Sequence, residues 1–407
     1  MPNPANRNGR PARRVLSLST LYPNSTNPRF GTFVARSLEA LAARNGWEVT
    51  CINPLGIPPI AFGKYRALKD AAVDGVENGV DVRRPTFPLI PRFGGRINPA
   101  IIARKVLPLA QELHAQTPFD ILDAQFFYPD GPAIASIAKE LGLPYSIKAR
   151  GADISYWGKQ DYGAEQMLDA ASGAAGLLAV SQALADDMAG MGMRREAITV
   201  HYTGLDRDRF RPLDHVGLRR KLGQELGLSL PSTAPLLATV GALIPRKGQE
   251  LVIGALADLT DAHLLLVGKG EDEHHLRRLA ADMGAAGRVH FLGSVDHNLL
   301  PVILSAADLM VLPSASEGLA NAWVESLACG TPLVITDAGG ARELVMGPEA
   351  GTIVERDLSS VTQGIRHMLA NLPSPRIVAA MAKRFSWEAN AGALAQYYER
   401  LIDRHAG

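Results

Sequence analysis

The chain has 407 residues, of which 47% are hydrophobic and 20% charged, and its formal net charge is +1. This length and composition indicate two globular domains, and no run reaches the roughly 18 apolar residues that span a bilayer. The basic residues are not interleaved with aromatics in the manner of nucleic-acid-binding modules, so we expect no nucleic-acid partner. Two cysteines, Cys51 and Cys329, are too few for a disulfide framework, and we expect both to be reduced and buried in a cytoplasmic protein.

The charge is unevenly distributed along the chain. Residues 1–110 hold 16 lysines and arginines against 6 aspartates and glutamates, a balance of +10, so the remainder carries −9. Such a basic segment fits peripheral contact with an anionic membrane or with a lipid-diphosphate acceptor, and it fits a solvated basic face equally well. We expect residues 1–12, which are rich in Pro, Asn and Arg, to form a disordered basic arm.

Apolar runs alternate with helix-like stretches along the first half of the chain, which is typical of a parallel α/β architecture. Helices are predicted at 33–43 and 131–141, and Ser181 is expected to cap the helix that follows the strand 176–180. Residues 54–100 contain many Pro and Gly and are expected to be irregular loops. The predicted strands of this half are 15–18, 49–52, 121–124, 145–148, 176–180 and 198–200.

The second half follows a connection at 203–234 and repeats the same alternation. A closing helix carries Trp387, Tyr397 and Tyr398. The predicted strands of this half are 236–241, 263–267, 289–292, 308–313 and 332–335. We therefore predict the disordered arm at 1–12 and structured segments at 13–205, 206–384 and 385–407.

The most informative segment lies between the last two predicted strands, at residues 316–332. It carries Glu317 in a loop and Glu325 eight positions later on a predicted helix. Eight positions are a little over two turns at about 3.6 residues per turn, so both carboxylates can face one crevice at the carboxyl end of the sheet. Carboxylates accept hydrogen bonds from vicinal hydroxyls, so the pair suits a polyhydroxylated ligand.

The first strand-to-helix turn of the second half carries two adjacent cations. Gly241 ends the strand and allows close backbone approach, while Arg246 and Lys247 precede Gly248 at a helix start. The helix dipole there favours anions, and preorganised donors aimed at a charged leaving group typically contribute about 3 kcal/mol each. Alone, such a pair is more often a solvated turn; upstream of the glutamate segment, it favours a diphosphate site.

These motifs, together with Gly339 and Gly340, resemble glycosyltransferase family 4, the retaining nucleotide-sugar glycosyltransferases of GT-B fold. The resemblance implies an α/β protein of two facing Rossmann-like doubly wound domains, with the acceptor bound by the domain 13–205 and the donor by the domain 206–384. It also implies that the closing helix, 385–407, packs back on the first domain. The implied reaction moves a sugar from a nucleotide diphosphate sugar, as co-substrate and without another cofactor, to an acceptor hydroxyl.

The resemblance also assigns roles to the two motifs. Glu317 looks like the glutamate that contacts the donor sugar, Glu325 like the one that holds the ribose hydroxyls, and Lys247 like a cation that grips the phosphates. The family usually has Arg directly after the turn glycine, where this chain has Ala242, so Arg246 is the candidate second cation. The catalytic set is thus expected to be Glu317, Lys247 and Arg246. The expected donor-binding residues are Glu325, Gly241, Gly248, Gly268, Gly270, Val295, Leu319, Ala320 and Asn321.

In the first half, segments 27–34 and 148–153 resemble loops of polysaccharide-assembling members. They make Gly31, Arg150 and Asp153 the acceptor-side candidates. Arg150 stands where the family often has His, so a guanidinium that does not titrate replaces an imidazole and could pair with an anionic acceptor or a phosphate. The resemblance favours exopolysaccharide or cell-envelope glycan assembly on a glycan or lipid-linked glycan acceptor, by a cytoplasmic protein that contacts the inner face of the membrane peripherally.

No metal site is expected, because the ten histidines lack zinc-ligand spacing and the only nearby Asp-X-Asp pattern, 206–208, lies at the domain junction. Two alternatives stay open. One is a nucleotide-sugar epimerase of GT-B fold, which would convert the donor without an acceptor. The other is a non-catalytic sugar-nucleotide or glycan-binding protein, which Ala242 and Arg150 would suit. The sequence leaves open the sugar and the choice among UDP, GDP and ADP.

Overall fold

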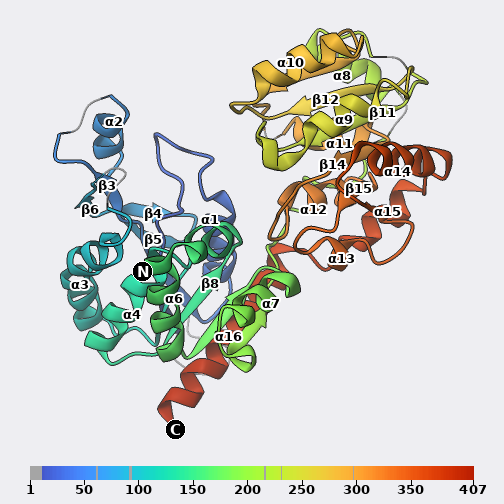
Figure 1. Ribbon diagram of the computed structural model, residues 1–407. Coiled ribbons are helices and arrows are strands. Elements are labelled where there is room, and N and C mark those ends of the chain that lie inside the picture. Colours follow the sequence, from blue (N-terminus) through green and yellow to red (C-terminus); the bar gives the residue numbers. More distant parts are fainter. Residues whose placement is uncertain (1–11, 61–62, 91–93, 215–216, 231, 297) are drawn as a thin grey trace. The chain divides into compact units, whose positions relative to one another are not determined.

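The computed structural model describes residues 12–60, 63–90, 94–214, 217–230, 232–296 and 298–407. The chain divides into two compact units, which Figure 1 colours blue to green, with a red closing helix, and yellow to red. Unit 1 comprises Met1–Gly204 and Trp387–Gly407, and unit 2 comprises Leu205–Ser386. Of the arm predicted to be disordered, 1–12, residues 1–11 lie outside the described residues.

Unit 1 is built on an eight-stranded sheet in the order β10-β9-β8-β7-β1-β2-β5-β4. Its pairings are parallel except for β4, which pairs antiparallel with β5 at one edge. The strands are β1 (Arg13–Leu18), β2 (Trp47–Ile52), β4 (Gly75–Glu77), β5 (Val80–Arg83), β7 (Ile121–Ala124), β8 (Tyr145–Ala149), β9 (Gly176–Ala179) and β10 (Ile198–Val200), with β3 (Leu55–Ile57) and β6 (Thr86–Pro88) forming a separate pair.

Helices cover both faces of this sheet. Successive side chains of a strand point to opposite faces, so Val15 and Leu16 of β1 enter different cores. The core that holds Leu16 also contains Ile102 of α3 and Ile134 of α4, whereas the core that holds Val15 contains Tyr398 of the closing helix α16. The helices of unit 1 are α1 (Thr32–Ala42), α2 (Lys64–Asp70), α3 (Asn98–Gln116), α4 (Asp130–Leu141), α5 (Ala152–Ser155), η1 (Trp157–Lys159), α6 (Asp161–Gly173), α7 (Gln182–Gly190), η2 (Arg195–Ala197) and α16 (Trp387–Ala406).

Unit 2 contains a six-stranded parallel sheet in the order β13-β12-β11-β14-β15-β16. The four central strands of the order are buried on both faces, as expected for a parallel sheet between helices, whereas the edge strands β13 and β16 are only partly buried. The strands are β11 (Leu236–Val240), β12 (His263–Val267), β13 (Val289–Gly293), β14 (Leu309–Leu312), β15 (Leu333–Thr336) and β16 (Gly351–Val354). The helices are α8 (Leu218–Leu226), η3 (Pro245–Lys247), α9 (Gln249–Ala255), α10 (Glu273–Asp282), α11 (Leu300–Ala306), α12 (Asn321–Ala328), α13 (Ala341–Leu344), α14 (Leu358–Ala370) and α15 (Pro375–Met381).

The structure confirms the α/β class, the parallel sheets and the packing of the closing helix with the first unit. Ser181 caps α7 as expected, because its Oγ accepts from Leu184 N at 3.1 Å. Cys51 and Cys329 are buried and free. None of the described helices is both long enough and apolar enough to cross a bilayer.

The prediction that 54–100 is irregular is wrong in part. This stretch contains α2 and the strands β3 to β6, and α3 begins at its end. Each of these strands has only three or four residues, which is too short for a period-2 pattern to stand out among Pro and Gly.

Candidate functional site

Most of the predicted site residues lie at the carboxyl edge of the unit 2 sheet. The strands β13, β12, β11 and β14 are consecutive and parallel, so the loops that follow them lie side by side. Open α/β sheets bind ligands at this edge. The loop residues are Gly241, Arg246, Lys247 and Gly248 after β11, Gly268 and Gly270 after β12, Val295 after β13, and Glu317, Leu319 and Ala320 after β14; Asn321 and Glu325 belong to α12.

The loops after β11 and β12 meet backbone to backbone. Gly268 has a φ of 142°, and a Cβ there would lie 1.8 Å from the Gly241 carbonyl oxygen, so the position requires glycine. Leu243 N donates to Lys269 O at 3.0 Å and continues the contact. Both turns are thereby fixed relative to each other at the edge of the sheet.

The loop after β14 is joined to the cationic turn. Ala315 N donates to Arg246 O at 2.8 Å, and Arg356 donates to Pro313 O at 3.1 Å and to Pro245 O at 2.8 Å. Sequence reasoning missed Arg356, which follows β16 in an ordinary loop and belongs to no motif. Its two bonds fix the spacing between the turns that carry the cations and Glu317.

The carboxylate of Glu317 and the two cations form one cluster. Lys247 Nζ donates to Glu317 Oε1, and Arg246 Nη1 lies 3.7 Å from Glu317 Oε2. The side chains of Glu317 and Lys247 are only 9% and 13% exposed, whereas Arg246 is 44% exposed. The structure thus brings together the three residues expected to form the catalytic set, with Arg246 at the outer side.

The N-terminus of α12 lies directly after this cluster. Its N-cap is Ala320, which has no side chain able to accept from the first amides of the helix. The amides around Leu319, Ala320 and Asn321 therefore start the helix without a side-chain cap. Together with the helix dipole, uncapped amides form a region of positive potential that suits an anion.

Glu325 lies on α12 and is partly buried. Burial raises the pKa of Glu325 to about 7, and no neighbouring charge contributes to the shift. Among the described residues, its carboxylate has no hydrogen-bond or ion-pair partner. A desolvated carboxylate without a protein partner costs free energy in the folded state, and ligand hydroxyls would relieve that cost.

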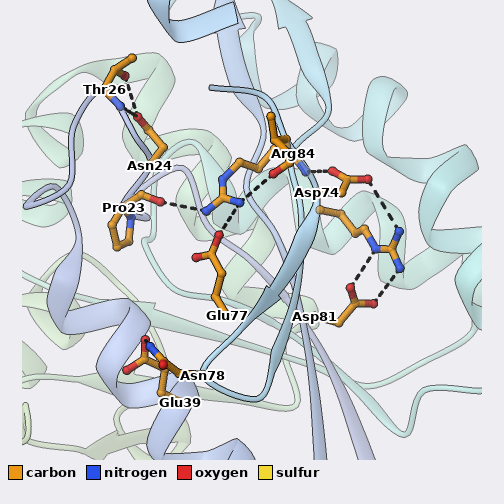
Figure 2. A network of polar contacts seen from close by, with 11 residues as sticks. Pro23, Asn24, Thr26, Glu39, Asp74, Glu77, Asn78, Asp81 and Arg84 are labelled. Atoms are coloured by element: carbon orange, nitrogen blue, oxygen red, sulfur yellow. Dashed lines mark hydrogen bonds and ion pairs between the residues drawn. The ribbon is translucent and has the colours of Figure 1, made fainter. Parts of the chain in front are cut away.

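In unit 1, Gly31 is the left-handed N-cap of α1, with a φ of 71°. A Cβ at Gly31 would lie 2.4 Å from the Leu21 carbonyl carbon, so the loop between β1 and α1 folds closely against the helix start. Arg84 contacts this loop at Pro23 (Figure 2). Its guanidinium donates to Pro23 O at 3.1 Å and to Val73 O at 2.9 Å, and it pairs with Glu77 at 2.7 Å.

Arg150 and Asp153 lie at the carboxyl end of β8, on the same edge of the unit 1 sheet. The carboxylate of Asp153 accepts from the backbone amides of Phe127, Arg150, Gly151 and Ile154 at 2.8–3.1 Å. Asp153 therefore organises the loop, and its oxygens are already engaged. Arg150 Nε and Nη2 each donate at 2.6 Å to Gln125, to the backbone oxygen and to Oε1 respectively.

A buried polar network lies behind these residues, and sequence reasoning missed it. Asp123 accepts from Ser17, Gln125 and Tyr398, while Lys148 Nζ lies 2.7 Å from His201 Nδ1. A signal was available, because Asp123 and Lys148 are charged residues within otherwise apolar strands. The network joins β1, β7, β8 and α16 through polar contacts in the interior of unit 1.

Two family descriptions match the chain. The one described as Glycosyltransferase Family 4 matches residues 31–209, and the one described as Glycosyl transferases group 1 matches residues 227–385. Among curated proteins, the D-inositol 3-phosphate glycosyltransferases of Mycobacterium tuberculosis and Mycobacterium bovis are 33% identical over 220 residues, or 51% of this chain. The matched stretch spans only 45% of the length of those relatives.

Solved structures resemble nearly the whole chain. Anabaena HepE in complex with UDP and glucose gives a TM-score of 0.71 at 22% identity, covering 95% of this chain and 99% of that one. Sucrose-phosphate synthase from Thermosynechococcus elongatus gives a TM-score of 0.72 at 21% identity, covering 96% and 100%. At such identities the likeness shows the fold, which is GT-B, and confirms the predicted fold class.

Proposed function

The chain belongs to the family 4 type of glycosyltransferases, and we propose that it moves a sugar from a nucleotide diphosphate sugar to an acceptor hydroxyl with retention of anomeric configuration. The observation that carries the proposal is the cluster of Glu317, Lys247 and Arg246 beside the uncapped start of α12. Two cations and a helix start concentrate positive potential where a diphosphate leaving group gains negative charge.

In this proposal Lys247 and Arg246 stabilise the diphosphate, and Glu317 orients the donor sugar by accepting hydrogen bonds from its hydroxyls. Glu317 also orients Lys247 through their ion pair. The leaving diphosphate itself assists the incoming hydroxyl on the same face of the sugar, which accounts for retention without a protein nucleophile. Catalysis is then electrostatic and positional, and it needs no metal ion.

Glu325 is proposed to hold the ribose hydroxyls of the donor. The absence of a protein partner among the described residues supports this role, because two vicinal hydroxyls would donate to the two carboxylate oxygens. Gly241, Gly268 and Gly270 are proposed to form the narrow wall through which the backbone approaches the nucleotide, and Val295 lies on the adjoining loop. Structural relatives solved in complex with UDP, UDP-glucose or ADP support a nucleoside diphosphate of this kind.

The acceptor is proposed to be a glycan or lipid-linked glycan in exopolysaccharide or cell-envelope assembly, reached by peripheral contact with an anionic membrane. The +10 balance of residues 1–110 supports such contact. Apolar side chains of the same segment stand out into solvent, with Ile60 69%, Val73 64% and Val76 76% exposed. Exposed apolar side chains within a segment of net positive charge suit the boundary between lipid headgroups and acyl chains.

The test is product analysis with UDP-, GDP- and ADP-sugars, with and without an oligosaccharide or polyprenyl-diphosphate acceptor, in buffer containing EDTA. The proposal expects release of nucleoside diphosphate that depends on acceptor, and a glycosylated product of retained configuration. Conversion of the donor sugar without acceptor would establish the epimerase instead. Binding of a nucleotide sugar without any turnover would establish the non-catalytic binder.

A further inference from the structure

Arg150 carries positive charge that the described part of unit 1 does not neutralise. Its Nε and Nη2 are held by Gln125, but Nη1 has no hydrogen-bond partner among the described residues, and no described carboxylate lies within ion-pair distance of the guanidinium. The side chain is partly exposed and Nη1 is not sealed from solvent. Nη1, with both of its N–H groups, is therefore available to a ligand in a direction that the rigid fork fixes.

Three acidic side chains act electrostatically on Arg150, and each of them accepts hydrogen bonds from other groups. Asp153 accepts from four backbone amides, and Asp123 accepts from Ser17, Gln125 and Tyr398. Asp130 accepts from Thr20 N at 2.9 Å, and its other oxygen is buried without a partner. Their charges act on the guanidinium, but among the described residues none of them forms a hydrogen bond or an ion pair with it.

A second source of positive potential lies against the same guanidinium. Arg150 Cζ stands 4.8 Å from the ring centroid of Phe33, which is the second residue of α1. That helix starts at Gly31 without a side-chain cap, so its first amides and its dipole add positive potential beside the Arg150 cation. The Arg150 cation and the start of α1 thus add their positive potentials at one place, and such a place favours an anion.

Burial lowers the pKa of Arg150 to about 10, and the nearby acids offset this lowering only in part. The protein therefore stabilises the charged guanidinium less well than water does. Lys148, on β8 two residues before Arg150, is itself a basic group and therefore offers Arg150 no counter-charge. In the proposed function, the donor diphosphate is already served by Lys247, Arg246 and the start of α12 in unit 2.

We propose that Arg150 is a specificity-determining residue that binds an anionic group, a phosphate or a carboxylate, on the acceptor. The identification of the ligand as the acceptor rests on the proposed function, whereas the anion site itself rests on the geometry of unit 1. A planar guanidinium held at two of its nitrogens presents the third in a fixed direction, which distinguishes an anionic acceptor from its neutral counterpart.

The experiment measures thermal stabilisation at constant ionic strength by glucose 6-phosphate against glucose, glucuronate against glucose, inorganic phosphate, and UDP. The proteins are wild type, Arg150→Gln, Arg150→Lys and a matched control, Arg36→Gln. Arg36 is an exposed residue of α1 that pairs with Glu39 one turn away. Far-UV circular dichroism establishes that each variant is folded; if Arg150→Gln is not, Arg150→Lys still decides, because it keeps the charge and loses the fork.

The proposal expects the charged sugars to bind wild type and Arg36→Gln at least about tenfold more tightly than glucose. Arg150→Gln should lose that preference, Arg150→Lys should keep part of it, and UDP affinity should stay within about twofold in all variants. An equal preference in Arg150→Gln, or none in wild type, overturns the proposal; if Arg150→Gln does not fold, an undiminished preference in Arg150→Lys overturns it. A loss of UDP affinity in Arg150→Gln, with sugar phosphates unaffected, overturns the acceptor assignment in favour of the donor diphosphate. Failure of UDP to bind wild type would count against the proposed function and not against the anion site.

Discussion

Glu317 and Lys247, 70 positions apart in the chain, form an ion pair at the carboxyl edge of the unit 2 sheet, and Arg246 approaches the other carboxylate oxygen at 3.7 Å. The pairing links the loop after β14 to the turn after β11. It brings Glu317 and Lys247 into one cluster although they come from separate motifs, and the proposed function uses this cluster as a catalytic unit. The predictions below follow from this arrangement and its neighbours in unit 2, and from buried charges within unit 1.

Replacement of Glu317 by Ala should lower the transfer rate by at least about 100-fold, which corresponds to about 3 kcal/mol of transition-state stabilisation. The carboxylate orients both the donor sugar and Lys247, so its loss removes two contacts at once. The measurement is kcat with saturating donor. Glu355→Ala, at an exposed position of the same unit, is the control and should keep full activity. Near-normal turnover of Glu317→Ala would contradict the role proposed for Glu317 in sugar transfer.

Lys247→Met should lower kcat by about 100-fold, whereas Arg246→Met should lower it by about tenfold. The difference follows from exposure, because Lys247 is 13% and Arg246 44% exposed, and water screens the outer cation more strongly. Steady-state kinetics of both variants with the same donor show which of them loses more kcat. A larger loss for Arg246→Met would mean that Arg246 replaces the cation missing at Ala242 as the principal phosphate contact.

Glu325→Gln should make the protein more stable than wild type at pH 8, by a free energy on the order of 2 kcal/mol. Burial raises the pKa of Glu325 from 4.5 to about 7, so the folded state holds the proton more tightly than the unfolded chain. Stability from this group is thus fully present below pH 4.5 and is lost as pH rises from 4.5 through about 7. Urea unfolding at pH 4.5 and pH 8 gives the comparison. A stability difference that does not change between these pH values would contradict the burial argument.

Gly268→Ala should destabilise the protein by about 3 kcal/mol or more, because the added methyl would overlap the Gly241 carbonyl oxygen at a positive φ. Gly287→Ala is the matched control, since a Cβ there meets open space. The control should change the free energy of unfolding by less than about 1 kcal/mol. Similar values for the two variants would show that the contact between the loops after β11 and β12 is not rigid.

Lys148→Met should flatten the dependence of stability on pH. Burial and the nearby Arg150 lower the pKa of Lys148 well below 10.5, and burial and Lys148 lower that of His201 well below 6.5. Unfolding therefore takes up protons, and wild-type stability should rise with pH toward 10.5. The variant should lose the lysine part of this slope in chemical unfolding at pH 7 and pH 9. An unchanged slope would mean that Lys148 is charged in the folded protein.

The sequence predicted the clustering of the unit 2 residues better than the surroundings of Arg150, for a physical reason. Glu317, Lys247 and Gly268 sit on turns directly after strongly apolar strands, so strand order alone brings them to one edge of a sheet. Arg150 also follows a strand, but its environment depends on Gln125 and Phe33, which come from two other elements. No local sequence pattern predicts contacts among residues so far apart in the chain.

The parts that the sequence did not predict are short or non-local. The strands β3 to β6 are too brief for periodicity, and Arg356 acts through two carbonyl oxygens that no motif marks. Asp123 and Lys148 were visible as charges within apolar strands, yet their partners come from β1, β10 and α16. Only the folded arrangement shows which buried charges have hydrogen-bond partners within the described residues.

The central claim, a nucleoside diphosphate site built on Glu325 and the loops of unit 2, is tested most directly by a thermal-shift panel of UDP, GDP, ADP and NAD. Wild type, Glu325→Ala and the control Glu355→Ala are compared. A ligand at 100 times its dissociation constant should stabilise by about 2.7 kcal/mol. The account predicts that one nucleoside diphosphate stabilises wild type and the control but not Glu325→Ala, and that NAD stabilises none of them. No shift at saturating concentrations, or an equal shift in Glu325→Ala, would contradict it.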